Sequence, residues 1–114
     1  MLIIGHRGAR GEAPENTLGG FRHLRDIGIR AVEFDIQVSA DNELVVIHDA
    51  DVNRTSNGTG SVHDLTAETL STLDASHSQF PAWPRQEGIP KLTDVLALLS
   101  DFSHIELEVK AKSP

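Results

Sequence analysis

The spacing of hydrophobic and polar residues predicts strands and helices in turn along the chain. In residues 31–38 apolar and polar side chains alternate, which is the period of a strand with one buried face. Residues 15–27 repeat an apolar side chain every three positions and are followed by Gly28, as expected for an amphipathic helix. The full predicted order is strand 2–5, helix 15–27, strand 31–38, strand 44–47, short helix 65–73, helix 92–99 and strand 105–109.

This order of elements predicts an α/β fold in one domain. A chain of 114 residues has the size of a single domain, which we place at 1–114. The connection between strands 31–38 and 44–47 is too short for a crossover helix. Either these two strands form an antiparallel hairpin, or an extended segment replaces the helix. Residues 50–90 are mostly irregular and form an excursion from the α/β pattern.

The starts of the helices are predicted from capping residues. Pro14 precedes the first helix and places Glu15 in its first turn. Asp64 or Thr66 introduces the short helix 65–73, and Thr93 is the candidate cap of the helix that follows.

Composition and charge exclude several classes of protein. The absence of cysteine excludes disulfides and thiolate zinc sites. Seventeen acids against ten Lys and Arg, a net charge of −7, argue against a nucleic-acid partner, because such proteins carry a basic face. A phosphate ligand would therefore need a local positive site, such as a bound cation. No apolar run is long enough to span a membrane, and no leader precedes the first strand, so we expect a cytoplasmic protein.

Polar residues gather at the ends of the predicted strands. His6, Asp35 and His48 each stand at such an end, where functional residues of parallel α/β barrels cluster. Glu33 and Asp35 share one strand face, and burying both unpaired would cost several kcal/mol each. A divalent cation removes that cost, and oxygen ligands favour Mg²⁺ or Ca²⁺ over zinc. The alternative is that both acids face solvent on an edge strand while the apolar face fills the core.

The last strand offers further candidates. Glu108 lies on one face with Lys110, so Glu108 can complete a metal shell and Lys110 can meet a phosphate oxygen. The alternative is a solvated strand face with a lysine at its rim. Of the six histidines, His6 and His48 follow apolar strands, and such a pair can act as acid and base because the ordinary pKa of imidazole is about 6.5. The other four are predicted to be surface residues: His23, His63, His77 and His104.

Together these residues resemble the glycerophosphodiester phosphodiesterase family. The resemblance spans nearly the whole chain, and its motifs occur in the family order with family-like spacing. The motifs are His6-Arg7-Gly8, Pro14-Glu15-Asn16-Thr17, Glu33-Phe34-Asp35, His48-Asp49, residues 54–60, Ile89-Pro90-Lys91-Leu92 and Glu108-Val109-Lys110.

The resemblance implies a TIM-type (β/α)₈ barrel, of which this chain covers roughly the first half: about four strands plus residues 50–90 as a capping excursion. It implies metal-dependent hydrolysis of glycerophosphodiesters to glycerol 3-phosphate and an alcohol. The implied roles are general acid and base for His6 and His48, binding of one Mg²⁺ or Ca²⁺ by Glu33, Asp35 and Glu108, neutralisation of the phosphate by Arg7 and Lys110, and lining or bracing of the site by Glu15 and Asn16.

The length of the chain departs from the family, because a complete barrel takes about 250 residues. The chain is part of a longer enzyme, a half-barrel that closes by pairing with a second copy, or a remnant that folds differently and is inactive. Two alternative functions remain open at this point. One is a related barrel phospholipase acting on lipid head groups, and the other is a non-catalytic phosphoester-binding or assembly module.

Overall fold

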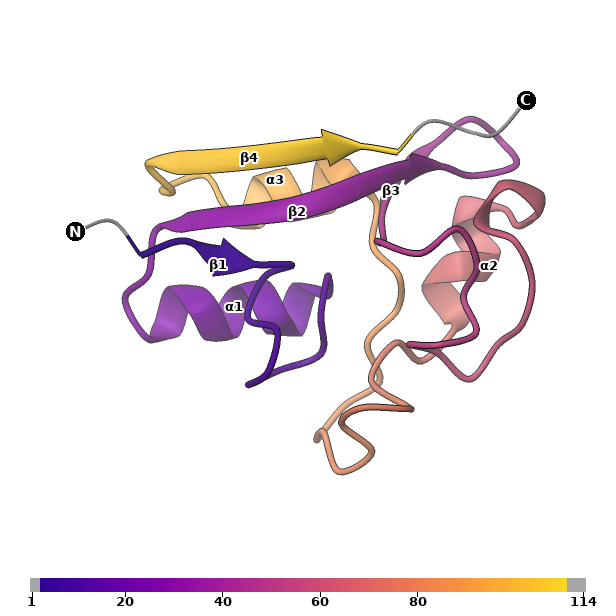
Figure 1. Cartoon of the computed structure of the whole chain (residues 1–114), viewed down its shortest axis with the longest axis horizontal. Coiled ribbons are helices and arrows are strands. Elements are labelled where there is room, and N and C mark those ends of the chain that lie inside the picture. Colours follow the sequence, from indigo (N-terminus) through magenta and orange to yellow (C-terminus); the bar gives the residue numbers. More distant parts are fainter. Residues whose placement is uncertain (1–2, 111–114) are drawn as a thin grey trace.

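The computed structural model describes residues 3–110, which form a four-stranded mixed sheet with helices α1 and α3 on one face (Figure 1). No helix of this described part is long and apolar enough to cross a membrane. The elements in chain order are β1 (Gly5–His6), α1 (Leu18–Asp26), β2 (Ala31–Val38), β3 (Leu44–Val46), the 3₁₀ helix η1 (Val62–Asp64), α2 (Ala67–Thr72), α3 (Leu92–Leu98) and β4 (His104–Val109).

Strand β2 is the centre of the sheet. It pairs in parallel with β1 on one edge and with β4 on the other, whereas β3 runs antiparallel along its last residues. The hairpin alternative for the connection between β2 and β3 is therefore the correct one. In the register with β4, Asp35 lies opposite Glu108. All three parallel strands point the same way in Figure 1, so their carboxyl ends meet at one side of the sheet.

The alternation in β2 divides its side chains between a core face and a polar face. Val32, Phe34 and Ile36 pack against α1 and α3 in the main hydrophobic cluster. Phe34 meets Phe21 of α1 edge to face, with ring centroids 5.2 Å apart. The acids of β2 consequently occupy the opposite face of the central strand, and the alternative of a solvated edge strand is wrong.

Residues 50–90, the excursion, supply most of a second hydrophobic cluster, which also includes Val45 of β3 and Ile47. In Figure 1 the excursion, with α2, lies toward the carboxyl end of β2. Thr66 caps α2, because its hydroxyl accepts a hydrogen bond from the Thr69 amide. The buried members of this second cluster are Val45, Ile47, Val52, Val62, Ala67, Leu70, Ala75 and Ile89.

Two predicted helix starts are wrong, for local reasons. Asn16 has a positive φ of 54°, so α1 begins only after Thr17, whose hydroxyl accepts from the Gly20 amide. Glu15 therefore precedes the helix instead of lying in its first turn. Helix α3 begins at Leu92 without a side-chain cap, and Thr93 lies inside the helix.

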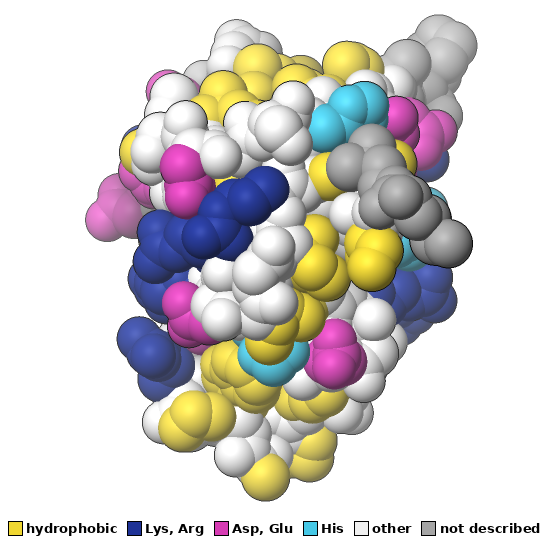
Figure 2. Space-filling view, turned by 90° about the vertical axis from the view of Figure 1, so that its left-hand side faces the viewer, with side chains coloured by type: hydrophobic (Ala, Val, Ile, Leu, Met, Phe, Trp, Pro, Cys, Tyr) yellow, Lys and Arg dark blue, Asp and Glu magenta, His cyan; other side chains and the backbone are white. Residues whose placement is uncertain are grey.

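The prediction of a buried strand over 2–5 is also wrong for the residues that the structure describes. Strand β1 contains only Gly5–His6, and Ile3 before it is 62% exposed. On the opposite edge Val109 of β4 is 69% exposed. These side chains lie on sheet edges that pair only with β2 in the described part of the chain. Figure 2, which views the end at which the strands begin, shows hydrophobic side chains open to the surface there.

Candidate active site

Three carboxylates converge on the polar face of the sheet. Glu33 and Asp35 come from β2 and Glu108 from β4, and one oxygen of each lies within 4.8 Å of the others. The parallel register of the two strands produces this approach, since Asp35 and Glu108 are direct neighbours. The burial of the three is graded, from Asp35 at 1% exposure to the open side chain of Glu108.

Of the three acids, Asp35 has the greatest need of a positively charged partner. Burial, followed by the negative charge of Glu33, raises its pKa, and the positive groups around it only partly oppose this effect. One of its oxygens is buried without a hydrogen-bond partner. Three oxygen donors with an orphaned buried carboxylate oxygen fit a hard divalent cation such as Mg²⁺ or Ca²⁺.

Two cationic side chains flank this acidic group. Arg7 has a left-handed backbone with φ of 50°, which turns its side chain inward until Nε lies 3.8 Å from Asp35 Oδ2. Lys110 Nζ donates to Glu108 Oε1 at 3.0 Å, and this bond holds the pKa of Glu108 below its ordinary value. His6 lies beside the same group, with Nδ1 3.6 Å from Glu33 Oε1.

His48 follows β3 and has a carboxylate partner in the next residue. Its Nδ1 lies 2.9 Å from Asp49 Oδ1. Arg54 and, to a smaller extent, His48 hold the pKa of Asp49 down to about 2, although burial opposes this effect. His48 is also close enough to Asp35 that its positive form would lower the pKa of that acid. The structure therefore brings His48 into the same polar region as the three carboxylates.

Arg54 joins this histidine to the loop after β1. Its Nε donates to Asp49 Oδ2 at 2.7 Å, and its two terminal nitrogens donate to Glu15 at 3.0 and 2.9 Å. Glu15 also lies 3.6 Å from Arg7 NH1. The hydrogen bonds to both acids raise the pKa of Arg54. Sequence reasoning gave Arg54 no role, and its only signal was its place at the head of the motif 54–60.

Gln37 is a second residue that sequence reasoning missed. It lies on the same face of β2 as the acids, and its side-chain nitrogen donates to the carbonyls of His48 at 2.9 Å and Asp49 at 2.6 Å. The strict alternation of β2 was the signal that placed it on the polar face. Gln37 thus fixes the backbone of the turn that carries His48.

Asn16 is buried close to this network, and its side chain has no polar partner. Its backbone N–H donates to the Arg7 carbonyl at 2.8 Å, but the side-chain Nδ2 and Oδ1 make no hydrogen bond. Asn16 shares a positive φ and a buried side-chain nitrogen without a hydrogen bond with Arg7 of the same loop.

The four histidines predicted to be surface residues lie outside this group. His63 bonds the Val38 carbonyl at 2.8 Å, and His104 bonds Glu106 at 2.8 Å. His23 lies 3.8 Å from Glu12, and His77 is exposed.

Asp49→Asn tests the contribution of the Asp49–Arg54 pair to acid stability. Because the folded state lowers the pKa of Asp49 from 3.8 to about 2, its stabilisation is complete above about pH 4 and is lost as the pH falls towards 2. We expect the variant to lose about 2 kcal/mol of unfolding free energy near neutral pH and nothing near pH 2. Urea unfolding of both proteins across this range, with Glu43→Gln as an exposed control, measures the difference. An equal loss at both ends of the range would contradict this origin.

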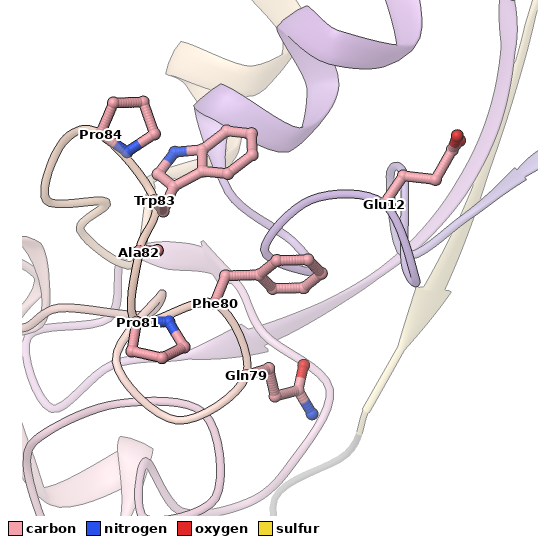
Figure 3. Close-up of a pocket in the computed structure, with 7 residues that line it drawn as sticks. All are labelled: Glu12, Gln79, Phe80, Pro81, Ala82, Trp83 and Pro84. Atoms are coloured by element: carbon pink, nitrogen blue, oxygen red, sulfur yellow. The ribbon is translucent and has the colours of Figure 1, made fainter.

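A separate apolar pocket of about 370 Å³ lies between the excursion and the loop after β1. Figure 3 shows the rings of Phe80 and Trp83 projecting from the excursion toward the loop that bears Glu12, whose carboxylate points away from them. Trp83 is held by its N–H bond of 2.9 Å to buried Glu87, and Glu87 also accepts from the Gly19 amide at 3.0 Å. None of the residues predicted to bind the metal, to bind the phosphate or to transfer protons lines this pocket.

The chain is similar to known proteins along nearly its whole length. Residues 6–114 match the profile of the Glycerophosphoryl diester phosphodiesterase family. The chain belongs to this family. It is 40% identical over 111 residues to a glycerophosphodiester phosphodiesterase of Caldanaerobacter subterraneus subsp. tengcongensis, covering 96% of this chain and 45% of that protein. It is 41% identical over 99 residues to human glycerophosphodiester phosphodiesterase 1, covering 85% of this chain and 30% of that one.

Solved structures of the glycerophosphodiester phosphodiesterase family share the fold. The enzyme from Agrobacterium tumefaciens superposes with a TM-score of 0.89 at 34% identity, over 97% of this chain and 48% of that one. A phosphodiesterase of Oleispira antarctica, in complex with its product sn-glycerol-3-phosphate, gives 0.88 at 34% identity, over 96% and 44%. The prediction of a (β/α)₈-barrel family, with roughly the first half in this chain, is confirmed. The chain spans less than half the length of these relatives.

Proposed function

We propose that this chain takes part in the metal-dependent hydrolysis of glycerophosphodiesters to glycerol 3-phosphate and an alcohol. One observation carries the proposal: one oxygen from each of the three carboxylates of β2 and β4 lies within 4.8 Å of the others. On the same face of the sheet, the positive charges of His48, Lys110 and Arg7 each lower the pKa of Asp35. Family membership supports the same reaction. We further propose the cytoplasm as its location.

Glu33, Asp35 and Glu108 would hold one Mg²⁺ or Ca²⁺. A cation bound there would stabilise negative charge on the phosphate oxygens and help to orient the substrate. Arg7 and Lys110 lie beside two of these acids, so their positive charges can neutralise a phosphodiester placed at the same point.

The two histidines divide the proton transfers. In the proposed first step, a glycerol hydroxyl attacks phosphorus, His48 accepts its proton, and the alcohol departs with a proton from His6. The product is a cyclic phosphate of glycerol. In the second step the roles reverse, so that His6 takes a proton from water, the water opens the ring, and His48 returns a proton to the glycerol oxygen. We assign the first acceptor role to His48 because its carboxylate partner Asp49 favours the neutral tautomer with the proton on Nδ1, in which Nε2 can accept a proton.

The direct test is release of glycerol 3-phosphate from glycerophosphocholine and glycerophosphoethanolamine with Mg²⁺, with Ca²⁺ and with EDTA. Cation-dependent release that disappears in His48→Ala would support the proposal. Absence of release under every condition would contradict it for this chain. Cation binding without hydrolysis would instead identify a non-catalytic phosphoester-binding module.

Phe80→Leu tests whether the apolar pocket receives the alcohol part of the substrate. The pocket borders the loop that carries Arg7, and its two aromatic rings offer π faces to a trimethylammonium group. We expect KM to rise about fivefold for glycerophosphocholine, with a smaller change for glycerophosphoethanolamine. Kinetics with both substrates measure the ratio, with Gln79→Ala as a control in the same pocket. An equal change for both substrates would contradict a choline-selective wall.

We expect this half-barrel to associate with a second copy. Exposed apolar side chains at both edges of the sheet, Ile3 beside β1 and Leu107 and Val109 on β4, would then be covered. Light scattering with size-exclusion chromatography should give twice the chain mass, and Val109→Lys should shift the equilibrium to monomer. A monomer that unfolds cooperatively across a wide concentration range would contradict this expectation.

A further inference from the structure

We propose that Arg54 is a positioning residue for the candidate catalytic histidine: it locks Asp49 against His48 and ties both to Glu15 in the loop that carries Arg7. The inference deepens the proposed function and rests on it, since His48 exchanges protons in that reaction. It gives residues 50–90 a role in setting the geometry of the site.

The protonation state of Asp49 determines the tautomer of His48. A carboxylate with a pKa near 2 is ionised at neutral pH and can only accept hydrogen bonds. The 2.9 Å contact with Nδ1 therefore requires the proton of neutral His48 to be on Nδ1. Nε2 is then left as the acceptor, which a general base needs. Any group that holds Asp49 in place maintains this tautomer.

Arg54 holds Asp49 with two of its N–H groups and Glu15 with two more. The bonds to Asp49 measure 2.7 Å from Nε and 3.2 Å from NH2, and those to Glu15 measure 3.0 and 2.9 Å. A planar guanidinium makes both bidentate contacts at once. The compact ammonium of lysine has no fork and cannot make both.

Glu15 connects Arg54 of the excursion with Arg7, which is proposed to bind the phosphate. Its side chain is 3% exposed and lies 3.6 Å from Arg7, which in turn lies 3.8 Å from Asp35. Acidic and basic groups thus alternate from His48 to the carboxylate face of β2. Without Arg54, the charges of Glu15 and Asp49 would lose their main compensation.

The backbone and the side chain of His48 are held by different residues. Gln37 fixes the carbonyls of His48 and Asp49, whereas Arg54 and Asp49 fix the imidazole. Loss of Arg54 should consequently release the ring while the turn stays in place. This separation makes the role of Arg54 measurable apart from folding.

Imidazole nitrogen NMR of ¹⁵N-labelled protein tests the inference without requiring turnover. The His48 signals are identified by their loss in His48→Gln. We expect the Nδ1–H tautomer in the unmodified chain, a mixture of tautomers in Arg54→Gln and Arg54→Lys, and no change in Arg85→Gln, an exposed arginine of the same excursion. A purely structural Arg54 would leave the tautomer unchanged in any variant that folds, and that result overturns the proposal.

Chemical rescue gives a second readout. Guanidinium ion added to Arg54→Ala should restore the Nδ1–H signal of His48, whereas ammonium ion should not. Where the chain hydrolyses glycerophosphocholine, kcat of Arg54→Gln should fall about 10- to 100-fold with little change in KM. If no hydrolysis is found, the proposed function fails while the tautomer experiment still decides the role of Arg54. If hydrolysis is found and Arg54→Gln keeps full kcat, the role of Arg54 is refuted.

Discussion

Glu33→Ala is expected to remove both cation binding and turnover, whereas His48→Ala should remove turnover alone. Glu33 is one of three carboxylates within 4.8 Å, and its loss leaves two acids, of which one is exposed. His48 bonds Asp49 instead of these acids, so its removal leaves all three in place. For His48→Ala we expect turnover to fall about 10²- to 10⁴-fold, as is usual for a general acid–base group. Calorimetric titration with Mg²⁺ and Ca²⁺, paired with product release, measures both effects.

Glu106→Ala is the matched control for this pair of variants. Glu106 lies on the same strand as Glu108 but bonds His104 at 2.8 Å and does not join the group of three. It removes the same charge from the same sheet, so both cation binding and turnover should persist. Equal loss of cation binding in Glu33→Ala and His48→Ala would refute the proposed division of roles.

His6→Ala is expected to lose activity on substrates whose leaving group must be protonated and to keep more activity on substrates whose leaving group need not be. Removal of the proton donor should slow release of choline about 10²- to 10⁴-fold. In a p-nitrophenyl ester the leaving group departs as the stable p-nitrophenolate anion and needs no proton. The same variant should therefore hydrolyse glycerophospho-p-nitrophenol with a much smaller loss of activity. His48→Ala should lose activity on both substrates, because the attacking hydroxyl still has to give up its proton.

The comparison of the two substrates distinguishes this assignment from its reverse. If His48→Ala instead spares the p-nitrophenyl ester, His48 is the acid and His6 the base. If both variants lose activity equally on both esters, neither histidine protonates the leaving group, and the proposed proton transfers are wrong.

Local alternation in the sequence was enough to predict the polar face of β2. Val32, Phe34 and Ile36 could be assigned to one side and Glu33 and Asp35 to the other, because a strand allows only two faces. The family motifs added Glu108 to this pair, and the parallel register brings it there.

Contacts between distant segments could not be predicted in the same way. Arg54 and Glu15 are 39 positions apart, and no local pattern tells an arginine in a loop which buried acid it will meet. The start of α1 failed for a different reason. Pro14 and Glu15 are common in a first helical turn, but the left-handed backbone of Asn16 excludes a helix there, and sequence periodicity carries no information on that conformation.

Val52, Val62 and Leu70 of the excursion belong to the second hydrophobic cluster and not to the one in which Phe34 packs against α1. We therefore expect substitutions at these three positions to leave the packing of Phe34 in place. Selection for a different alcohol can therefore reshape residues 50–90 while the carboxylates of β2 and β4 stay unchanged. Such divergence is constrained at the contacts that join the excursion to the rest of the chain, such as Arg54 with Glu15 and Glu87 with the start of α1, where both partners would have to be retained or replaced together.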